Sequence, residues 1–200
     1  MQKIDTIIFD LGGVLIDWDP RNLYRKIFAE EGEMEWFLEN VCNGPWNHAQ
    51  DAGRSFAEAT ELLVPKFPRY EDQIRAFFTR WPEMITGDRP ETVAIQQALI
   101  KNPKYRVVAL TNWSAETFPW ALDHFPFLHD FEGILVSGDE NLAKPDPAIY
   151  QLLLDRYDID PAKAFFIDDA PKNIAAAWKL GIAGHRYTSA ERLEEALGLM

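Results

Sequence analysis

The stretch Ile7-Ile8-Phe9-Asp10-Leu11-Gly12-Gly13-Val14-Leu15 decides the fold. Its first residues are apolar and typical of a buried β-strand, and the two glycines after Asp10 indicate a tight turn. In open α/β sheets, ligands bind at the carboxyl ends of the strands. A carboxylate at the end of a buried strand is costly unless it has a partner. Asp10 is therefore the first candidate for a reacting group.

The second half of the chain alternates between short apolar runs and helical patterns. We expect strands at residues 106–110, 134–136, 164–167 and 183–187, and helices at 90–100, from 147, at 171–180 and after 189. Such alternation predicts a parallel sheet with helices on both faces. The expected fold class is α/β, with a Rossmann-like, doubly wound parallel sheet.

Residues 18–88 interrupt this alternation directly after the first strand. The segment holds four of the seven tryptophans and has apolar residues at helical spacing, such as Leu23 and Ile27. We therefore predict a small all-helical cap at residues 18–88. The α/β core domain would then consist of residues 1–17 and 89–200.

Composition excludes several classes of partner. A chain of 200 residues, 47% hydrophobic and 26% charged, suits one globular domain with a small insert. The net charge of −12 argues against a nucleic acid or an anionic membrane as partner. Cys42 is the only cysteine, no run of about 18 apolar residues occurs, and the first residues are unlike a signal peptide. We expect a cytoplasmic protein that is a monomer or a weak dimer.

Polar groups follow each of the first four predicted core strands, at the carboxyl end. They are Asp10, Thr111 with Asn112, Lys144, and Asp168 with Asp169. Each alone has an ordinary structural explanation, such as a turn, a solvated lysine or a helix cap. Because the carboxyl ends of parallel strands meet at one edge, we expect these groups to share one crevice.

These residue types suit phosphoryl transfer assisted by a divalent cation. Three carboxylates in one crevice raise one another's pKa unless a cation lies among them. Mg²⁺ prefers one or two carboxylates together with waters and a substrate phosphate. Lys144 and the Thr111 hydroxyl can hold phosphoryl oxygens, and Asp10 can attack phosphorus. Lys144 can also keep Asp10 ionised.

The chain resembles the haloacid dehalogenase-like hydrolase superfamily, in the branch with a helical cap after the first strand. Its motifs are Phe-Asp-Leu-Gly-Gly-Val at 9–14, Leu-Thr-Asn at 110–112, Ala-Lys-Pro-Asp-Pro at 143–147, and Ile-Asp-Asp at 167–169 with Asn173. The resemblance implies that Asp10 is the nucleophile, assisted by Lys144. It implies phosphate ligands at Thr111, Asn112 and Lys144, and a Mg²⁺ ion held by Asp10, the carbonyl of Gly12, Asp168 and Asp169. The implied reaction is Mg²⁺-dependent hydrolysis of a small phosphorylated metabolite through an aspartyl phosphate.

Gly12 departs from the family pattern. Phosphatases of this superfamily usually carry a second aspartate at this position, which protonates the leaving group. A general acid contributes about 10²–10⁴ in rate, so its loss should narrow the substrates to leaving groups that need little protonation. These are glycosyl 1-phosphates, acyl phosphates and aryl phosphates. Some relatives with a non-acidic residue here resemble sugar-1-phosphate phosphatases, which agrees with this expectation.

Four other groups are candidates to replace the missing acid: Asp17, Asp19, His48 and Asp51. Each also has a purely structural explanation, since the two aspartates before Pro20 suit a turn and a helix start. Trp113 is a candidate for the wall of the pocket, and its alternative place is the core.

Two other functions stay open at this level. In a haloacid dehalogenase-type hydrolase, Asp10 would attack carbon and the halide would leave without an acid or a metal. That reading leaves Asp168 and Asp169 unexplained. A phospho-ligand-binding protein with little turnover would also accept Gly12.

Overall fold

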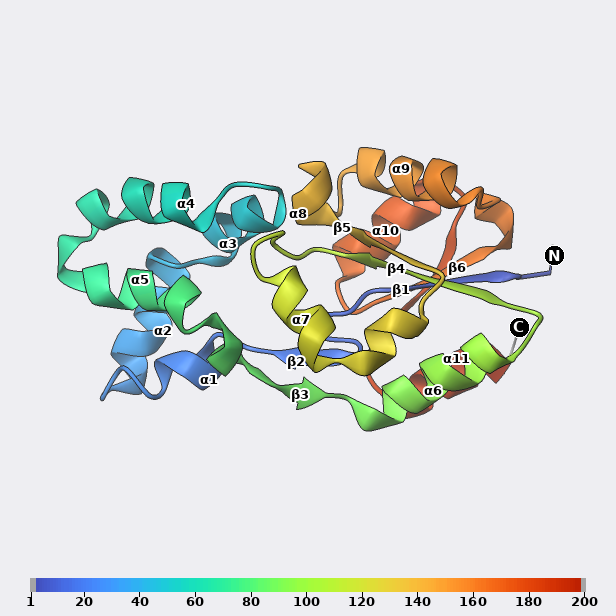
Figure 1. Cartoon of the computed structure of the whole chain (residues 1–200), viewed down its shortest axis with the longest axis horizontal. Helices are drawn as coiled ribbons and strands as arrows, with labels where there is room; N and C mark the ends of the chain where they lie inside the picture. Colours follow the sequence, from blue (N-terminus) through green and yellow to red (C-terminus); the bar gives the residue numbers. More distant parts are fainter. Residues whose placement is uncertain (1–2, 199–200) are drawn as a thin grey trace.

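A five-stranded parallel sheet forms the centre of the computed structural model, which describes residues 3–198 (Figure 1). Its strands are β1 (Thr6–Phe9), β4 (Arg106–Thr111), β5 (Gly133–Val136), β6 (Ala164–Asp168) and β7 (Ala183–Arg186). They lie in the order β5-β4-β1-β6-β7. Because β1 pairs with both β4 and β6, its carboxyl end opens between two neighbouring strands. The predicted doubly wound α/β fold is confirmed.

The alternation of side chains along β1 explains why helices cover both faces. Ile7 and Phe9 belong to one buried cluster and Ile8 belongs to the other. The first face is covered by α6 (Pro90–Lys101), α7 (Phe118–His124) and α11 (Ala190–Gly198). The second face is covered by α9 (Pro147–Tyr157) and α10 (Pro171–Lys179). No helix within residues 3–198 is both long enough and apolar enough to cross a membrane.

The predicted core elements lie within a few residues of the observed ones, but the short elements are not predicted. They are α7, α8 (Ser137–Glu140) and the 3₁₀ turns Pro126–Asp130 and Pro161–Lys163. Segments of this length are too short to show a helical period in the sequence. α8 nevertheless matters for the site, because the loop after it carries Lys144.

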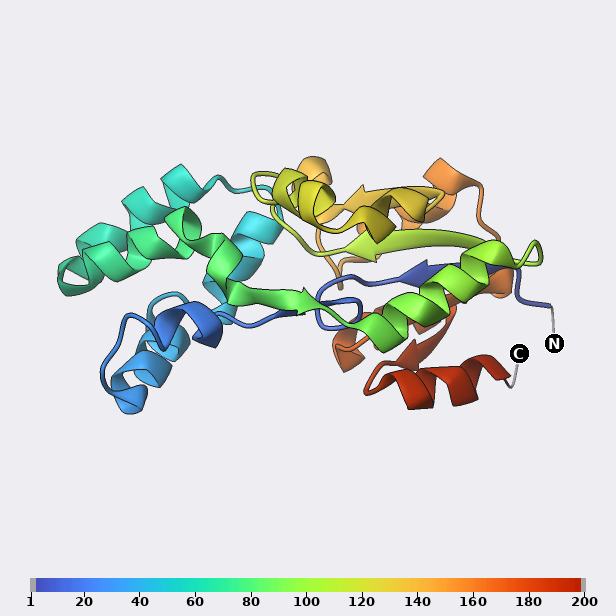
Figure 2. The same cartoon turned by 60° about the horizontal axis from the view of Figure 1, so that its bottom comes forward.

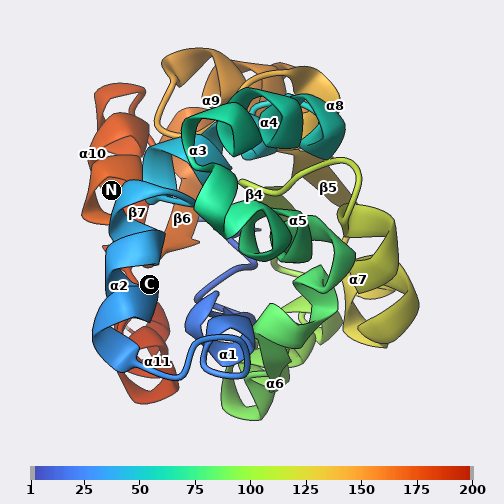
Figure 3. The same cartoon turned by 90° about the vertical axis from the view of Figure 1, so that its left-hand side faces the viewer.

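A helical segment extends beyond the carboxyl ends of the strands, nearest the viewer in Figure 3. It consists of α1 (Arg21–Tyr24), α2 (Glu31–Asn40), α3 (Gly44–Asp51), α4 (Phe56–Leu63), α5 (Glu71–Thr79) and the 3₁₀ turns Val64–Lys66, Pro68–Tyr70 and Trp81–Met84. The helices pack around Tyr24, whose ring centroid lies 5.0 Å from that of Phe37 and 6.4 Å from that of Phe77. We call this segment the cap.

A two-stranded antiparallel ribbon carries the chain from the core to the cap and back (Figure 2). Its strands are β2 (Ile16–Trp18) and β3 (Ile85–Asp88). Asp17 on β2 accepts hydrogen bonds from Thr86 and from Arg89, both at 2.8 Å. The predicted boundaries fall within β2, at 17/18, and at the end of β3, at 88/89, so the segment predicted to be helical at 18–88 begins and ends with strand residues of the ribbon.

Gly138 lies where α8 meets the loop after β4. The two main chains approach so closely there that a larger residue has no room for its Cβ. A Cβ there would meet the main-chain nitrogen of Ala115 and lie 2.7 Å from the carbonyl oxygen of Trp113. We expect Gly138→Ala to lower the free energy of unfolding by about 1–3 kcal/mol because the backbone must shift. Urea denaturation measures this value. The control Gly32→Ala, in α2 with no atom within 4 Å of the new Cβ, should be neutral or stabilising. Equal losses in both variants would contradict the prediction.

Candidate active site

Asp10 follows β1 directly and is fixed by its own main chain. Its amide donates to the carbonyl oxygen of Ile167 at 2.8 Å, which continues the pairing with β6. One carboxylate oxygen, Oδ1, accepts a hydrogen bond from the amide of Leu11 at 2.8 Å. No described residue donates a hydrogen bond to the other oxygen, Oδ2. The side chain is therefore oriented, with one oxygen left for chemistry.

The buried ammonium group of Lys144 joins two carboxylates. Its Nζ lies 2.9 Å from Oδ1 of Asp10 and 2.7 Å from Oδ2 of Asp168. It also donates to the carbonyl oxygen of Leu110 at 2.9 Å. An ammonium has three donors, so these contacts use all of them. Burial alone would lower the pKa of Lys144, but the two carboxylates raise it above its usual value.

Asp168 is fully buried at the end of β6 and is surrounded by donors. Its Oδ1 accepts from the amide of Ala170 at 2.8 Å, and Nδ2 of Asn173 lies 3.0 Å from both carboxylate oxygens. Asn173 lies in the first turn of α10 and belongs to the fourth motif. These bonds fix the carboxylate at the start of that helix.

The side chain of Asn112 binds both the amide and the carbonyl group of Lys144. Its Oδ1 accepts from the amide of Lys144 at 2.8 Å, and its Nδ2 donates to the carbonyl oxygen of Lys144 at 2.9 Å. The side chain of Asn112 therefore positions the loop that carries the ammonium. Its predicted role as a phosphate ligand stays a prediction.

Three carboxylates come together at the end of the sheet. Asp10, Asp168 and Asp169 each offer an oxygen, and these oxygens lie within 4.8 Å of one another. Burial raises the pKa of Asp10 well above its usual value; Lys144 opposes this shift, and Asp168 and Asp169 add to it. Burial and the charge of Asp168 also raise the pKa of Asp169. Lys144 offsets one of three negative charges, so the excess charge and the oxygen donors fit a hard divalent cation.

Two further groups complete the predicted set. The carbonyl oxygen of Gly12 accepts no hydrogen bond from the described residues. Gly12 also lies in the wall of a cavity that Asp10 and Asp169 line. The hydroxyl of Thr111 is fully buried and has no partner within the described part of the chain. A buried hydroxyl without a partner costs about 1–3 kcal/mol. An anion next to the end of β4 would satisfy it.

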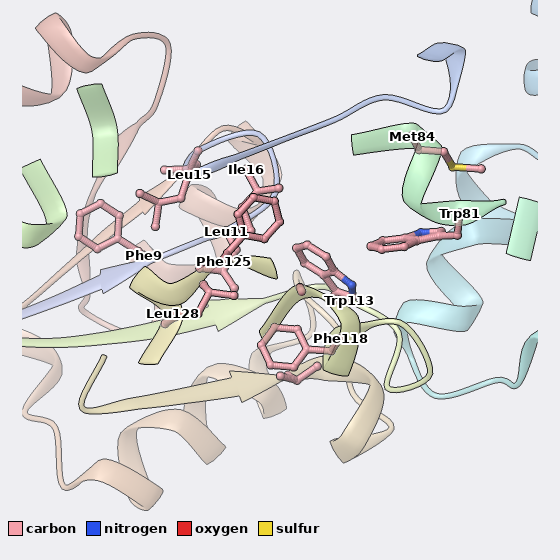
Figure 4. Close-up of a cluster of buried hydrophobic side chains, with 14 of the residues drawn as sticks. Phe9, Leu11, Leu15, Ile16, Trp81, Met84, Trp113, Phe118, Phe125 and Leu128 are labelled. Atoms are coloured by element: carbon pink, nitrogen blue, oxygen red, sulfur yellow. The ribbon is translucent and has the colours of Figure 1, made fainter. Parts of the chain in front are cut away.

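A cavity of about 340 Å³ lies in front of Asp10, between the core and the cap. Its walls include the aromatic side chains of Trp18, Phe56, Trp81 and Trp113 and the polar side chains of Asn47 and Asp51. Figure 4 shows Trp81 of the cap beside Trp113 of the loop after β4, and their ring centroids lie 5.6 Å apart. Such an apolar pocket with a few polar groups is typical of a small-molecule site.

Of the four candidates for the missing acid, Asp51 alone lies in the cavity wall. Asp17 is bound to Arg89 on the ribbon. Asp19 accepts from the amide of Arg21 at the start of α1. His48 lies outside the wall, and burial lowers its pKa.

The sequence gives little sign that Phe56 and Trp81 line this cavity. Aromatic residues in a small helical segment are ordinarily part of its core. The available signal is their position at helix ends. Phe56 follows the N-cap Ser55 of α4, and Trp81 starts the turn before the ribbon.

A family model for haloacid dehalogenase-like hydrolases matches residues 4–181. The chain belongs to this family. It is therefore a hydrolase, as predicted. The match covers the ribbon, the cap and the four motif segments, three of which contribute residues to the wall of the cavity.

Several proteins of known name resemble this haloacid dehalogenase-like (HAD-like) hydrolase. Acyl-CoA dehydrogenase family member 10 of Mus musculus is 28% identical over 96% of the chain, which spans 19% of that protein's length. Sesquiterpene phosphatase astK of Aspergillus oryzae is 24% identical, over 90% of the chain and 88% of the relative. The phosphorylated carbohydrates phosphatase of Thermotoga maritima is 24% identical, over 90% of the chain and 82% of the relative.

A solved HAD family enzyme of Bacteroides thetaiotaomicron is also similar. It was crystallised in complex with magnesium and inorganic phosphate. It is 27% identical, the alignment covers 92% of this chain and 94% of that chain, and the TM-score is 0.68.

Removing the ammonium group from this HAD-like hydrolase should leave Asp10 and Asp168 buried without their partner. We expect Lys144→Met to lower the free energy of unfolding by about 3–5 kcal/mol, measured by urea denaturation in the presence of a chelator. The control Lys163→Met removes an ammonium 3.7 Å from Asp160 at the surface and should change stability little. Equal stability of the two variants would show that the ion pairs do not support the fold.

Proposed function

We propose that the protein is a Mg²⁺-dependent phosphatase that hydrolyses a small phosphorylated metabolite through an aspartyl phosphate on Asp10. One observation carries the proposal: oxygens of Asp10, Asp168 and Asp169 lie within 4.8 Å of one another. Asp10 and Asp169 also line a cavity of about 340 Å³, large enough for a small metabolite.

In this proposal, Asp10, Asp168, Asp169 and the carbonyl oxygen of Gly12 hold the Mg²⁺ ion. When bound, Mg²⁺ offsets the negative charge of the phosphoryl group and of the carboxylates around it. The magnesium and phosphate in the Bacteroides enzyme support this assignment.

The nucleophile is Oδ2 of Asp10. Leu11 and Lys144 hold Oδ1, which leaves Oδ2 in a fixed orientation for attack on phosphorus. The charge of Lys144 favours the ionised form of Asp10. Thr111 donates its hydroxyl to a phosphoryl oxygen. A contact between Lys144 and the phosphate requires the ammonium to exchange one of its three present acceptors.

Because Gly12 offers no proton beside Asp10, the leaving group is expected to be one that departs more readily than a primary alcohol. Glycosyl 1-phosphates are the first class, followed by acyl and aryl phosphates. The aromatic walls of the cavity suit the flat face of a sugar or an aromatic ring. The two phosphatases among the relatives support the class of phosphate monoesters, and their names include a carbohydrate and a terpene substrate.

Asp10→Asn tests the nucleophile. We expect kcat on any accepted phosphate monoester to fall by about 10⁴-fold or more, because an amide cannot form the phosphoenzyme. The control Asp139→Asn, in α8, should keep its activity. A chelator should abolish turnover by the native enzyme, and Mg²⁺ should restore it. Turnover of the phosphate monoester that persists in chelator would contradict the Mg²⁺ dependence.

The absence of an acid at Gly12 predicts a preference among sugar phosphates. The kcat/KM for glucose 1-phosphate should exceed that for glucose 6-phosphate, because the anomeric oxygen leaves more readily than a primary alcohol. Steady-state kinetics with Mg²⁺ measures the ratio. A higher kcat/KM for glucose 6-phosphate would refute the leaving-group preference and leave the phosphatase assignment standing.

A further inference from the structure

We infer that the carboxyl group of Asp51, at the end of α3 in the cap, donates to the leaving group the proton that Gly12 cannot supply. The inference rests on the proposed phosphatase function and adds a residue to it. It assigns part of the chemistry to the cap, through a residue that lines the same cavity as Asp10.

Two hydrogen bonds with the core fix the segment that carries Asp51. The carbonyl oxygen of Asp51 accepts from the hydroxyl of Ser137, at the start of α8, with an oxygen–oxygen distance of 2.5 Å. The amide of Phe56, at the start of α4, donates to Oε1 of Glu116 at 2.7 Å. The cap is therefore attached to the core on both sides of the turn after Asp51.

The turn itself also packs against the core. Gly53 has a φ of 101°, a left-handed conformation that favours glycine. A Cβ at this position would collide with the side chain of Asn141, which follows α8. Close approach of the two main chains thus helps to hold Asp51 against the cavity.

Asp51 is the proton donor that remains when the other groups are considered. Among the described residues that line the cavity, it carries the one carboxyl group outside the cluster of Asp10, Asp168 and Asp169. The other polar groups of the wall are amides, hydroxyls and indoles, which are much weaker acids. One of them, the hydroxyl of Thr117, already accepts from Nε1 of Trp113 at 3.1 Å.

The surroundings of Asp51 favour its protonated form. Within residues 3–198 no basic side chain forms an ion pair with it. The hydrogen bond that its Oδ2 accepts from Nδ2 of Asn47, at 3.3 Å, acts in the opposite direction and favours the carboxylate. Burial raises the pKa of Asp51 to about 7, and the charge of Lys144 opposes that shift. A carboxyl group with a pKa near neutrality carries and releases a proton readily, as a general acid requires.

Oδ2 of Asp10 attacks phosphorus, the bond from phosphorus to the ester oxygen breaks, and its electron pair stays on that oxygen. The carboxyl of Asp51 gives this oxygen its proton, so the leaving group departs as an alcohol and Asp51 becomes a carboxylate. Water then attacks the phosphoenzyme and releases its proton to solvent, and Asp51 regains a proton from solvent. Asp10 leaves as a carboxylate and inorganic phosphate is released.

Asp51→Asn is the test, because it keeps the shape and removes the acid. On glucose 1-phosphate, we expect kcat to fall by about 10²–10⁴, with little change in KM. On 4-nitrophenyl phosphate, whose leaving group departs without a proton, kcat should stay within a few-fold. The control Asp72→Asn, exposed on α5 of the cap, should match the native enzyme on both substrates.

Equal losses on both substrates, or no loss on either, would overturn the role of Asp51. So would a rise in KM at constant kcat, which marks a binding residue. These outcomes are distinct from failure of the phosphatase assignment. In that case, 4-nitrophenyl phosphate would be hydrolysed equally by the native enzyme and by Asp10→Asn.

A second variant tests the same role by restoring an acid at another position. A Cβ at Gly12 meets no atom within 4 Å, so Gly12→Asp can place a carboxyl beside Asp10. On glucose 1-phosphate, the kcat of the double variant Asp51→Asn with Gly12→Asp should be at least tenfold higher than the kcat of Asp51→Asn alone. Absence of any gain in a folded double variant would contradict proton donation as the function of Asp51.

Discussion

The buried ammonium of Lys144 holds together two carboxylates that would otherwise repel each other. Its contacts with Asp10 and Asp168, at 2.9 and 2.7 Å, join the ends of β1 and β6. Its contact with Leu110 adds β4. Three neighbouring strands therefore meet at one cation, and the loop after α8 must place that cation correctly. Asn112 does so by binding the main chain of Lys144 on both sides.

The cap supplies what the sheet lacks. The sheet presents carboxylates, a hydroxyl and an ammonium, which suit the phosphoryl group but give the leaving group little to bind. Trp81 and Phe56 of the cap add apolar surface to the cavity wall, and Asp51 of the cap adds the carboxyl group that we propose as the acid. Because the ribbon and the contacts at Ser137 both attach the cap to the core, reactive group and recognition surface are held in one arrangement.

The sequence predicts the sheet and the ends of its strands well, since buried parallel strands are apolar runs that stop at polar residues. Asp10, Thr111 and Asp168 are found in this way. The proximity of Lys144 to Asp10 is expected from the sequence, but its contacts with Asp168 and Leu110 are not, because those partners lie on other elements of the chain. The sequence also does not show that Asp17 and Asp51 have different surroundings. Both are aspartates near the ends of short elements, and only the fold pairs the first with a surface arginine and places the second in the cavity.

The most direct measurement is a crystal structure of the protein with Mg²⁺ and beryllofluoride, which mimics a phosphoryl group on a carboxylate. The account predicts beryllium bonded to Oδ2 of Asp10, with one Mg²⁺ ion bound by Asp10, Asp168 or Asp169 and by a fluoride. Beryllofluoride absent from Asp10, or Mg²⁺ bound away from these carboxylates, would contradict the claim that a shared cation makes Asp10 the nucleophile.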